Sequence, residues 1–364
     1  MLPTVSEGAL RNAFNWTKSV LGVIGKDLHR YRRALKASGS HYLSLCNRHE
    51  RLELAPDGSG YRCSWQWTSE LHAPKYLPSL GLALLRRAMA DHRIERRARP
   101  VSSSGTPAVS FLIGHRGLAR LPHLLATIES IAGQRDVEVE CVVIEQDAEP
   151  RARTHLPEWV KYIHTKPSIP MMPYCRAWAF NVGARIARGR VLIMHDNDML
   201  VPVDYAREIL RRIDDGFEAI NVKRFIFYLS EAHSREVFQR ARPDRFPPSG
   251  VVQNLEAGGS VAIAGESYMR IGGMDESFVG WGGEDNEFWE RVQTLRLWPY
   301  GYMPLIHLWH APQPEKAMEK RATTDHYIRR SRVAPAERIA ELAVRDFGNP
   351  ERPDPPWRPN GADR

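Results

Sequence analysis

The feature that most constrains the fold is a short apolar run that leads directly into a cluster of acids. Residues 189–202 read GRVLIMHDNDMLVP, so residues 191–194 are apolar and Asp196, Asn197 and Asp198 follow almost at once. Such a bounded apolar run predicts a buried strand of a parallel sheet, although it also fits a segment of a buried helix. In open α/β sheets, ligands bind beyond the carboxyl ends of the strands. Asp196 and Asp198 are therefore candidate ligands for a divalent cation, with a solvated surface turn as the alternative.

The segments around this strand alternate between strand and helix patterns. Strands are predicted at residues 108–113, 137–144, 159–164 and 191–194, and helices at 118–132 and 173–187. This order predicts an α/β fold, with a mostly parallel sheet flanked by helices. A helix at 204–214 and strands at 219–228 and 259–264 continue the pattern. Neither G-x-G-x-x-G after the first strand nor G-x-x-x-x-G-K-[ST] occurs, so no Rossmann or P-loop site is indicated.

The first 35 residues predict a basic amphipathic helix. Apolar residues recur at helical spacing over residues 9–35, with Arg11, Lys18, Lys26, Arg30, Arg32 and Arg33 among them. Gly22 and Gly25 suggest a break in the helix. Its apolar face can pack on the protein itself, or it can make a peripheral contact with an anionic membrane.

A hairpin and a linker follow that helix. Residues 51–55 and 61–67 flank the turn sequence PDGSG, and the second run alternates aromatic residues on one face. That face fits either a core or a surface that stacks on sugar rings. Residues 81–97 predict a helix, and the PVSSSGTP sequence at 100–107 has linker composition. We therefore expect an N-terminal accessory region of helix, hairpin, helix and linker at 1–106, a main domain at 107–320, and a C-terminal helix with a Pro-rich tail at 321–364.

Composition and charge narrow the class of protein. The 364 residues are 43% hydrophobic and 26% charged, which is typical of a globular protein. No apolar run approaches the length of a bilayer span, and the first eight residues lack the order of a secretion signal, so we expect a cytoplasmic protein. The net charge of +8 suits an anionic partner. Nucleic acid ranks last among such partners, because the basic residues are spread along the chain without a recognised motif. The four cysteines lack metal spacing and fit buried free thiols.

A second acidic cluster lies in the sequence GWGGEDNE at residues 280–287. Three glycines around Trp281 predict a mobile loop, and Glu284 and Asp285 then begin a helix. The positive end of the helix dipole predicts that both acids stay ionised at neutral pH. The pair fits either a catalytic base or the acidic first turn of a surface helix.

Two histidines lie close together near residue 310. The sequence LIHLWH separates His307 and His310 by three residues among apolar neighbours. Such histidines are either structural or ligands that complete the coordination of a metal ion held by Asp198.

Four motifs together resemble a known family. YCRAWAFNVG (174–183), HDNDMLVP (195–202), GWGGEDNE (280–287) and HLWH (307–310) resemble, in order and spacing, the β-1,4-galactosyltransferase family of GT-A glycosyltransferases. They also resemble related bacterial family 2 enzymes and the polypeptide N-acetylgalactosaminyltransferases. The similarity covers about residues 107–320 and implies a GT-A (nucleotide-diphospho-sugar transferase) fold for this domain.

The resemblance implies a metal site and a donor site. Asp198 would bind Mn²⁺ or Mg²⁺, with His310 as a second ligand and His307 as a weaker one. Asp196 would contact the ribose of the donor or orient the ligands of the metal. The donor, a nucleotide-sugar of the UDP type, would be bound by a larger group that comprises His115, Arg116, Glu145, Asp147, Arg176, Asp196, Asn197, Gly282 and Gly283.

The resemblance also implies the catalytic residues. Trp281 would close over donor and acceptor, Glu284 would bind the acceptor, and Asp285 would be the catalytic base. Retaining relatives carry an amide where this chain has Asp285, so an inverting reaction is implied. Asp285 would deprotonate an acceptor hydroxyl as it attacks the anomeric carbon, and the cation would neutralise the leaving diphosphate.

The function expected from the sequence is that of an inverting, metal-dependent glycosyltransferase. Its acceptor would be a sugar, a glycan or a glycosylated small molecule, and the sequence indicates no oligomeric state. Three alternatives remain open: a retaining glycosyltransferase of the N-acetylgalactosaminyltransferase type, a metal-dependent sugar-nucleotide hydrolase or phosphodiesterase, and a non-enzymatic module that binds nucleotides or glycans.

Overall fold

The chain forms two compact units. The computed structural model describes residues 7–64, 69–101, 105–169, 172–253, 255–312 and 315–350. The first unit comprises Met1–Arg93, Lys223–Leu255 and Tyr300–His307, and the second comprises Ile94–Val222, Glu256–Pro299 and Leu308–Arg364. The predicted boundary lay at residue 106, whereas the structure divides after Arg93 and adds two later segments to the first unit.

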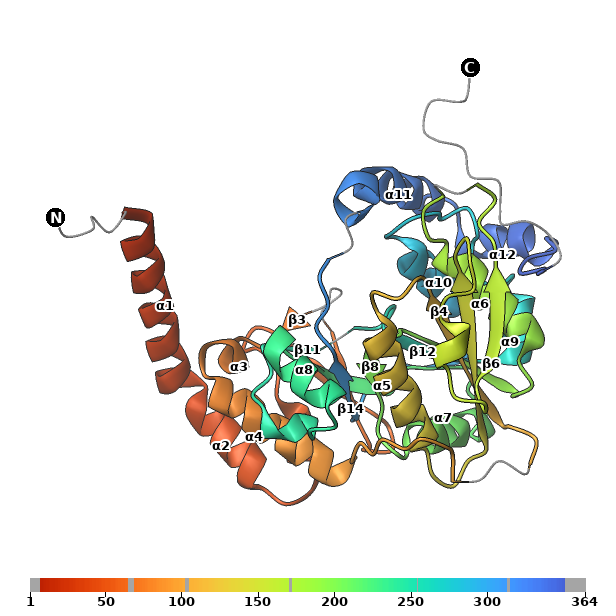
Figure 1. The fold of residues 1–364 in the computed structure, drawn as a ribbon. Helices are drawn as coiled ribbons and strands as arrows, with labels where there is room; N and C mark the ends of the chain where they lie inside the picture. Colours follow the sequence, from red (N-terminus) through yellow and green to blue (C-terminus); the bar gives the residue numbers. More distant parts are fainter. Residues whose placement is uncertain are drawn as a thin grey trace. The chain divides into compact units, whose positions relative to one another are not determined.

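The second unit is built on a seven-stranded sheet (Figure 1). Its strand order is β13-β9-β12-β7-β4-β5-β6. The bounds are β4 (Val109–His115), β5 (Val139–Gln146), β6 (Lys161–Thr165), β7 (Val191–His195), β9 (Ala219–Ile220), β12 (Ser260–Ala264) and β13 (Leu297–Trp298). Strands β7, β4, β5 and β6 are parallel, and β12 is antiparallel to both β7 and β9. The predicted α/β fold with a mostly parallel sheet is confirmed.

Helices cover both faces of this sheet. They are α5 (Leu121–Ala132), α6 (Arg176–Ile186), α7 (Tyr205–Asp214), α9 (Gly265–Arg270) and α10 (Glu284–Val292). Helices α11 (Glu315–Ser331) and α12 (Pro335–Ala343) pack on α10, and the unit also has the short strand β8 (Met199–Leu200) and the turn η2 (Arg153–His155). Because side chains alternate along a strand, neighbours on β4 face opposite layers. The ring centroids of Phe111 and of Tyr205, at the start of α7, are 6.5 Å apart, whereas Leu112 belongs to the core beside α6.

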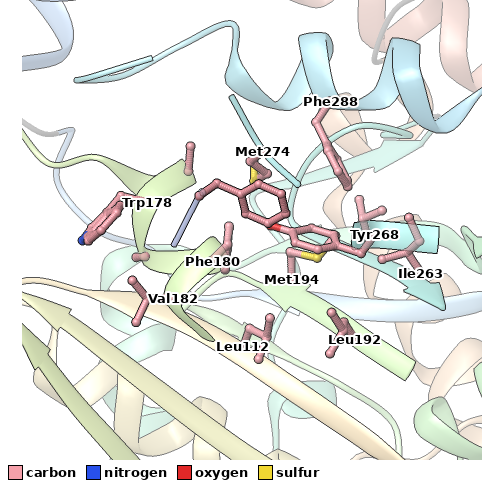
Figure 2. Packing of buried hydrophobic residues seen from close by; sticks show 14 of the residues in the cluster. Leu112, Trp178, Phe180, Val182, Leu192, Met194, Ile263, Tyr268, Met274 and Phe288 are labelled. Atoms are coloured by element: carbon pink, nitrogen blue, oxygen red, sulfur yellow. The ribbon is translucent and has the colours of Figure 1, made fainter. Parts of the chain in front are cut away.

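The main core of the second unit fills the space between the sheet and helices α6, α9 and α10. Figure 2 shows Leu112, Leu192, Met194 and Ile263 from the sheet beside Phe180, Tyr268 and Phe288 from these helices. Burial of a large apolar side chain contributes about 1.5–3 kcal/mol. This core therefore holds α6 and α10 on the sheet that contains β7. One acidic cluster follows the end of β7, and the other begins α10.

The first unit combines helices with a smaller sheet. Its helices are α1 (Glu7–Lys26), α2 (Leu28–Lys36), α3 (His72–Tyr76), α4 (Pro78–Asp91) and α8 (Glu231–Phe238), with the 3₁₀ turns η1 (Gly39–Ser44) and η3 (Pro243–Arg245). Its strands are β1 (Leu52–Leu54), β2 (Tyr61–Cys63), β3 (Ser69–Glu70), β10 (Lys223–Tyr228), β11 (Gly250–Gln253) and β14 (Met303–His307). Strands β1 and β2 form the predicted hairpin, and β3, β11, β10 and β14 lie side by side in that order.

A buried arginine joins the parts of the first unit. Arg224 on β10 donates hydrogen bonds to the carbonyl oxygens of Leu43 and Leu45, both at 2.8 Å, and to Gln253 Oε1, also at 2.8 Å. Burial lowers the pKa of Arg224 to about 10, so the guanidinium stays charged at neutral pH. Segments distant in the sequence thus share one set of buried hydrogen bonds.

The structure corrects several predicted boundaries. The first helix breaks at Asp27 and not at the glycines, because buried Asp27 pairs with Arg30 and Arg48 between α1 and α2. The strand predicted at 219–228 is two strands, β9 and β10, which belong to different units. The predicted aromatic positions Trp65 and Trp67 lie outside the described residues. Within the described part of the chain, no helix combines the length and apolar content of a bilayer span.

Candidate functional site

The first acidic cluster brings Asp198 together with an arginine and a histidine. Asp198 is almost fully buried, and its Oδ2 lies 3.1 Å from a guanidinium nitrogen of Arg120 and 3.2 Å from His310 Nε2. The other terminal nitrogen of Arg120 lies 3.0 Å from His310 Nδ1. The backbone N–H of Leu308 donates to the carbonyl oxygen of Asp198 at 2.8 Å, which ties the segment that carries His310 to the acid.

These side chains fit a divalent cation. Two adjacent ligands of one ion, each about 2.1 Å from it, lie about 3 Å apart, which matches the separation of Asp198 Oδ2 and His310 Nε2. A carboxylate oxygen and an imidazole nitrogen are a donor set that Mn²⁺ and similar ions accept. The guanidinium of Arg120 also marks this position as one that receives positive charge. The predicted ligands Asp198 and His310 therefore meet in the second unit.

His307, the third predicted ligand, ends β14 in the first unit. Its ring stacks on that of Tyr228 with 4.3 Å between the ring centroids and 21° between the planes. The stacking fixes the ring plane of His307 three residues before His310 in the chain.

The second acidic cluster is joined to the first by Arg176. This residue begins α6, donates to Asp196 Oδ1 at 2.6 Å and forms an ion pair with Asp285 Oδ1. The same guanidinium lies 3.8 Å from Glu284 Oε1 and packs over the ring of Phe180. Burial by itself would lower the pKa of Arg176, but the three carboxylates outweigh it and raise that pKa well above the usual value. Arg176 is thus a permanent cation between two groups of acids.

The pKa of Glu284 is shifted by its surroundings. It is buried, and its Oε2 accepts a hydrogen bond of 3.0 Å from the backbone N–H of Gly282. Burial, followed by the nearby charge of Asp285, raises the pKa of Glu284 to about 7, although Arg176 opposes the shift. The prediction that both acids stay ionised at neutral pH rested on the helix dipole, and the burial of Glu284 opposes that effect.

The glycines before α10 adopt backbone conformations that other residues avoid. Gly280, Gly282 and Gly283 have φ values of 97°, 112° and 92°, all in the left-handed region. A Cβ on Gly283 would also lie 2.8 Å from Tyr327 Cβ. Trp281, within this loop, is 40% exposed, and its carbonyl oxygen accepts a hydrogen bond from Thr323. The loop therefore presents one large ring to solvent from a constrained backbone.

His115 and Arg116, at the end of β4, form hydrogen bonds within the protein. His115 Nε2 lies 2.6 Å from the carbonyl oxygen of Gly117, and its Nδ1 lies 3.0 Å from Asn197 Nδ2. Burial lowers the pKa of His115, which keeps the ring neutral, so Nε2 donates and Nδ1 accepts. Arg116 donates to the carbonyl oxygens of Gln146 and Met172. These contacts fix the loop after β4 against Asn197.

Glu145 and Asp147, at the end of β5, differ in their surroundings. The carboxylate of Glu145 is fully buried and accepts hydrogen bonds from the backbone N–H of Ala152 and from the Tyr162 hydroxyl. Asp147 is only half-buried and lies near Arg151, 3.8 Å away. Glu145 therefore shapes the loop, whereas Asp147 is the one of the two acids that reaches the surface.

The sequence patterns did not predict two residues that lie near the predicted metal ligands. Arg120 directly precedes α5, and His123 in its first turn lies 2.7 Å from the carbonyl oxygen of Trp309 through Nε2. The ring centroids of His123 and His310 are 6.3 Å apart. The available signal was a group of basic residues just after the first strand, at the sheet edge where ligands bind.

Buried ion pairs hold α10 from behind. Glu287 pairs with Arg291 at 2.7 Å and with Arg338 of α12 at 3.0 Å, and all three side chains are inaccessible to solvent. Arg291 also donates to the carbonyl oxygens of Ile271 and Gly273. The helix that begins with Glu284 is therefore fixed in place by its opposite face.

Two family models match parts of this chain. Residues 119–259 match the glycosyl transferase family 2 model, and residues 253–299 match the model of the N-terminal domain of galactosyltransferase. The first match contains Arg120, Arg176 and the Asp196–Asp198 cluster, and the second contains Glu284 and Asp285. A search of curated proteins finds no match. One similar solved structure is a mannosyltransferase, PcManGT from Pyrobaculum calidifontis, in complex with GDP-Man and Mn²⁺. It has 16% sequence identity and a TM-score of 0.43, over 73% of this chain and 76% of that chain.

Proposed function

Because the chain is a glycosyltransferase with the GT-A fold, we propose that it is an inverting, metal-dependent enzyme that uses a UDP-sugar as donor. The sugar would pass to a hydroxyl group of a sugar, a glycan or a glycosylated small molecule. The observation that carries the proposal is the contact of one guanidinium, that of Arg176, with both Asp196 and Asp285. This contact supports a site in which the proposed donor-binding acid, Asp196, and the proposed base, Asp285, lie on either side of one arginine.

Asp198 and His310 would hold the divalent cation, Mn²⁺ or Mg²⁺, with His307 as a third ligand. Their support is the 3.2 Å separation of the first two side chains and, for His307, its spacing of three residues from His310. When bound, the cation neutralises charge on the diphosphate leaving group. Arg120, which contacts Asp198 and His310, would then turn towards the phosphates, because guanidinium groups bind phosphate oxygens in pairs.

Asp285 would be the base that removes the proton of the acceptor hydroxyl. In the structure its carboxylate is engaged by Arg176, and a carboxylate paired in this way is a weaker base. A bound diphosphate offers Arg176 a second anionic partner, and the movement of the guanidinium would release Asp285. The enzyme would therefore bind the donor before the base becomes active, which limits proton transfer without a sugar to attack.

Glu284 and Trp281 would bind the acceptor. With a pKa of about 7, Glu284 can be either a donor or an acceptor of hydrogen bonds to sugar hydroxyls near neutral pH. The exposed ring of Trp281 offers a flat apolar face to a sugar ring. Both residues precede Asp285 in the sequence, Glu284 directly and Trp281 within the same loop, so an acceptor held by both would present its hydroxyl to the base.

The remaining predicted residues would form the donor pocket. We propose that Asp147 and Asn197 contact the nucleotide, since both are only half-buried. His115, Arg116 and Glu145 would act indirectly, because their described hydrogen bonds shape the loops after β4 and β5. Gly282 and Gly283 would allow the backbone of the loop to approach the donor closely.

Release of the nucleotide diphosphate and the stereochemistry of the product test the function. A panel of sugar nucleotides should show Mn²⁺-dependent release of UDP that increases when a suitable acceptor is added. NMR of the product from an α-linked donor should show a β linkage, because one displacement inverts the anomeric carbon. An α-linked product would favour the retaining alternative. UDP release that no acceptor increases would favour the hydrolase.

A further inference from the structure

Helix α1 presents an apolar stripe that the other described residues of its unit leave exposed. Phe14, Leu21 and Ile24 are 70%, 63% and 46% exposed, and with Thr17 they recur at the spacing that places residues on one face of a helix. The packed side of α1 is different, since Val23 is fully buried. Figure 1 shows α1, in red, extending beyond α2, its neighbour in the same unit. An exposed stripe of this kind marks a surface for a partner.

The surroundings of the stripe are strongly basic. Residues 8–36 contain seven lysines and arginines but a single acid, Asp27. Asp27 is buried and paired with Arg30 and Arg48, so it contributes no negative charge to the surface. Lys18 and Lys26 on α1 are exposed. The partner of this helix should therefore be both anionic and apolar.

We propose that α1 docks the protein on an anionic lipid bilayer. An interfacial helix inserts its apolar side among the acyl chains while its lysines and arginines bind the acidic headgroups. A second copy of the chain fits less well, because two α1 helices would bring basic residues together with Glu7, the first residue of the helix, as the single acid of each α1. The polar Thr17 at one of the four positions of the stripe also weakens it as a coiled-coil seam.

Co-sedimentation with vesicles tests the docking surface. The full chain should bind vesicles of phosphatidylcholine and phosphatidylglycerol, in a ratio of roughly seven to three, and should not bind phosphatidylcholine alone. The double variant Phe14→Ser, Leu21→Ser should bind at least about tenfold more weakly, because two apolar anchors are lost. The double variant Lys18→Gln, Lys26→Gln should also bind about tenfold more weakly.

A matched control separates this surface from general stickiness. Leu54 on β1 is 51% exposed in the same unit, and Leu54→Ser should bind vesicles like the parent protein. Equal binding by the Phe14→Ser, Leu21→Ser variant, or no binding of the parent to anionic vesicles, would reject the proposal. Light scattering that shows a dimer of the parent and a monomer of this variant would replace the bilayer with a second copy. None of these measurements depends on glycosyl transfer.

Discussion

Asp198 and Asp285 are both held by an arginine at the start of a helix, but their surroundings differ. Arg120 directly precedes α5, and Arg176 is the first residue of α6. The side chain of Asp198 is 4% exposed and adjoins His310, whereas that of Asp285 is 33% exposed. The ion pair of Asp198 is therefore buried beside a histidine, whereas the ion pair of Asp285 is open to solvent. We infer that the closed acid serves binding and the open acid serves proton transfer.

The most direct way to break this comparison is to remove the proposed base. Asp285→Asn keeps the size of the side chain but removes its ability to accept a proton. Transfer should fall by about two to four orders of magnitude, the range of general-base loss, while calorimetry shows that the affinity for Mn²⁺ and donor is not weakened. Asp214→Asn, which removes an exposed carboxylate paired with Arg190, is the control and should leave the rate unchanged. Transfer at the parent rate by Asp285→Asn would assign the proton to another group.

The opposite result is expected for the buried acid. Asp198→Ala should weaken metal-dependent donor binding by at least about a hundredfold, because the proposed anionic ligand is lost. His310→Ala should raise the Mn²⁺ concentration needed for half-maximal turnover by about tenfold or more, since only Asp198 and the weaker proposed ligand His307 remain. Calorimetry of donor binding with and without Mn²⁺ measures both effects. Undiminished metal-dependent affinity in Asp198→Ala would remove the acid from the metal site.

Replacement of Arg176 tests the link between the two clusters. Arg176→Lys keeps the charge but loses the fork that reaches Asp196 and Asp285 together. We expect donor affinity to fall by about tenfold and the turnover of bound donor to fall as well, because the released base is no longer coupled to the diphosphate. Steady-state kinetics should therefore show changes in both KM and kcat. A change confined to KM would leave Arg176 as a simple phosphate ligand.

Replacement of Arg120 tests whether the two arginines differ in their effect on Mn²⁺ affinity. Its guanidinium contacts both proposed ligands of the ion, so its charge opposes a metal that binds without donor. Arg120→Gln should tighten Mn²⁺ binding in the absence of donor by at least about threefold, whereas Arg176→Gln should not. Electron paramagnetic resonance of free Mn²⁺ measures this affinity directly. Equal effects of the two substitutions would mean that both arginines oppose the metal to the same degree.

Local patterns in the sequence predicted the second unit better than the first. The apolar runs at 108–113, 137–144 and 191–194 correspond to β4, β5 and β7 within two residues. The first unit was missed because its sheet pairs residues 69–70 with residues 252–253, and no local pattern signals a contact over that distance. Deletion of residues 1–106 would therefore remove β3 and α4 from beside the strands that remain, rather than a separate module.

The site was predictable where residue type decides the chemistry. Asp198 and His310 were expected together because carboxylates and imidazoles are common types of metal ligand, and the two side chains lie 3.2 Å apart. The contacts of Arg120 depend on the direction of the chain before α5, which the sequence does not specify. The protonation of Glu284 depends on burial, which follows from packing at a distance along the chain.

A prediction about stability tests the protonation of Glu284. Its pKa rises from 4.5 in the unfolded chain to about 7 in the folded protein, so the folded state binds more protons between these values. Stability should therefore be greater at pH 5 and should decrease as the pH rises towards 7, by at most about 1.4 kcal/mol per pH unit for this group. Glu284→Gln resembles the protonated form and lacks this dependence. Urea unfolding at pH 5 and pH 8 should show that the variant gains stability relative to the parent at the higher pH. A constant difference at the two pH values would mean that Glu284 stays ionised beside Arg176, and the second cluster would then be uniformly charged, as the sequence alone predicted.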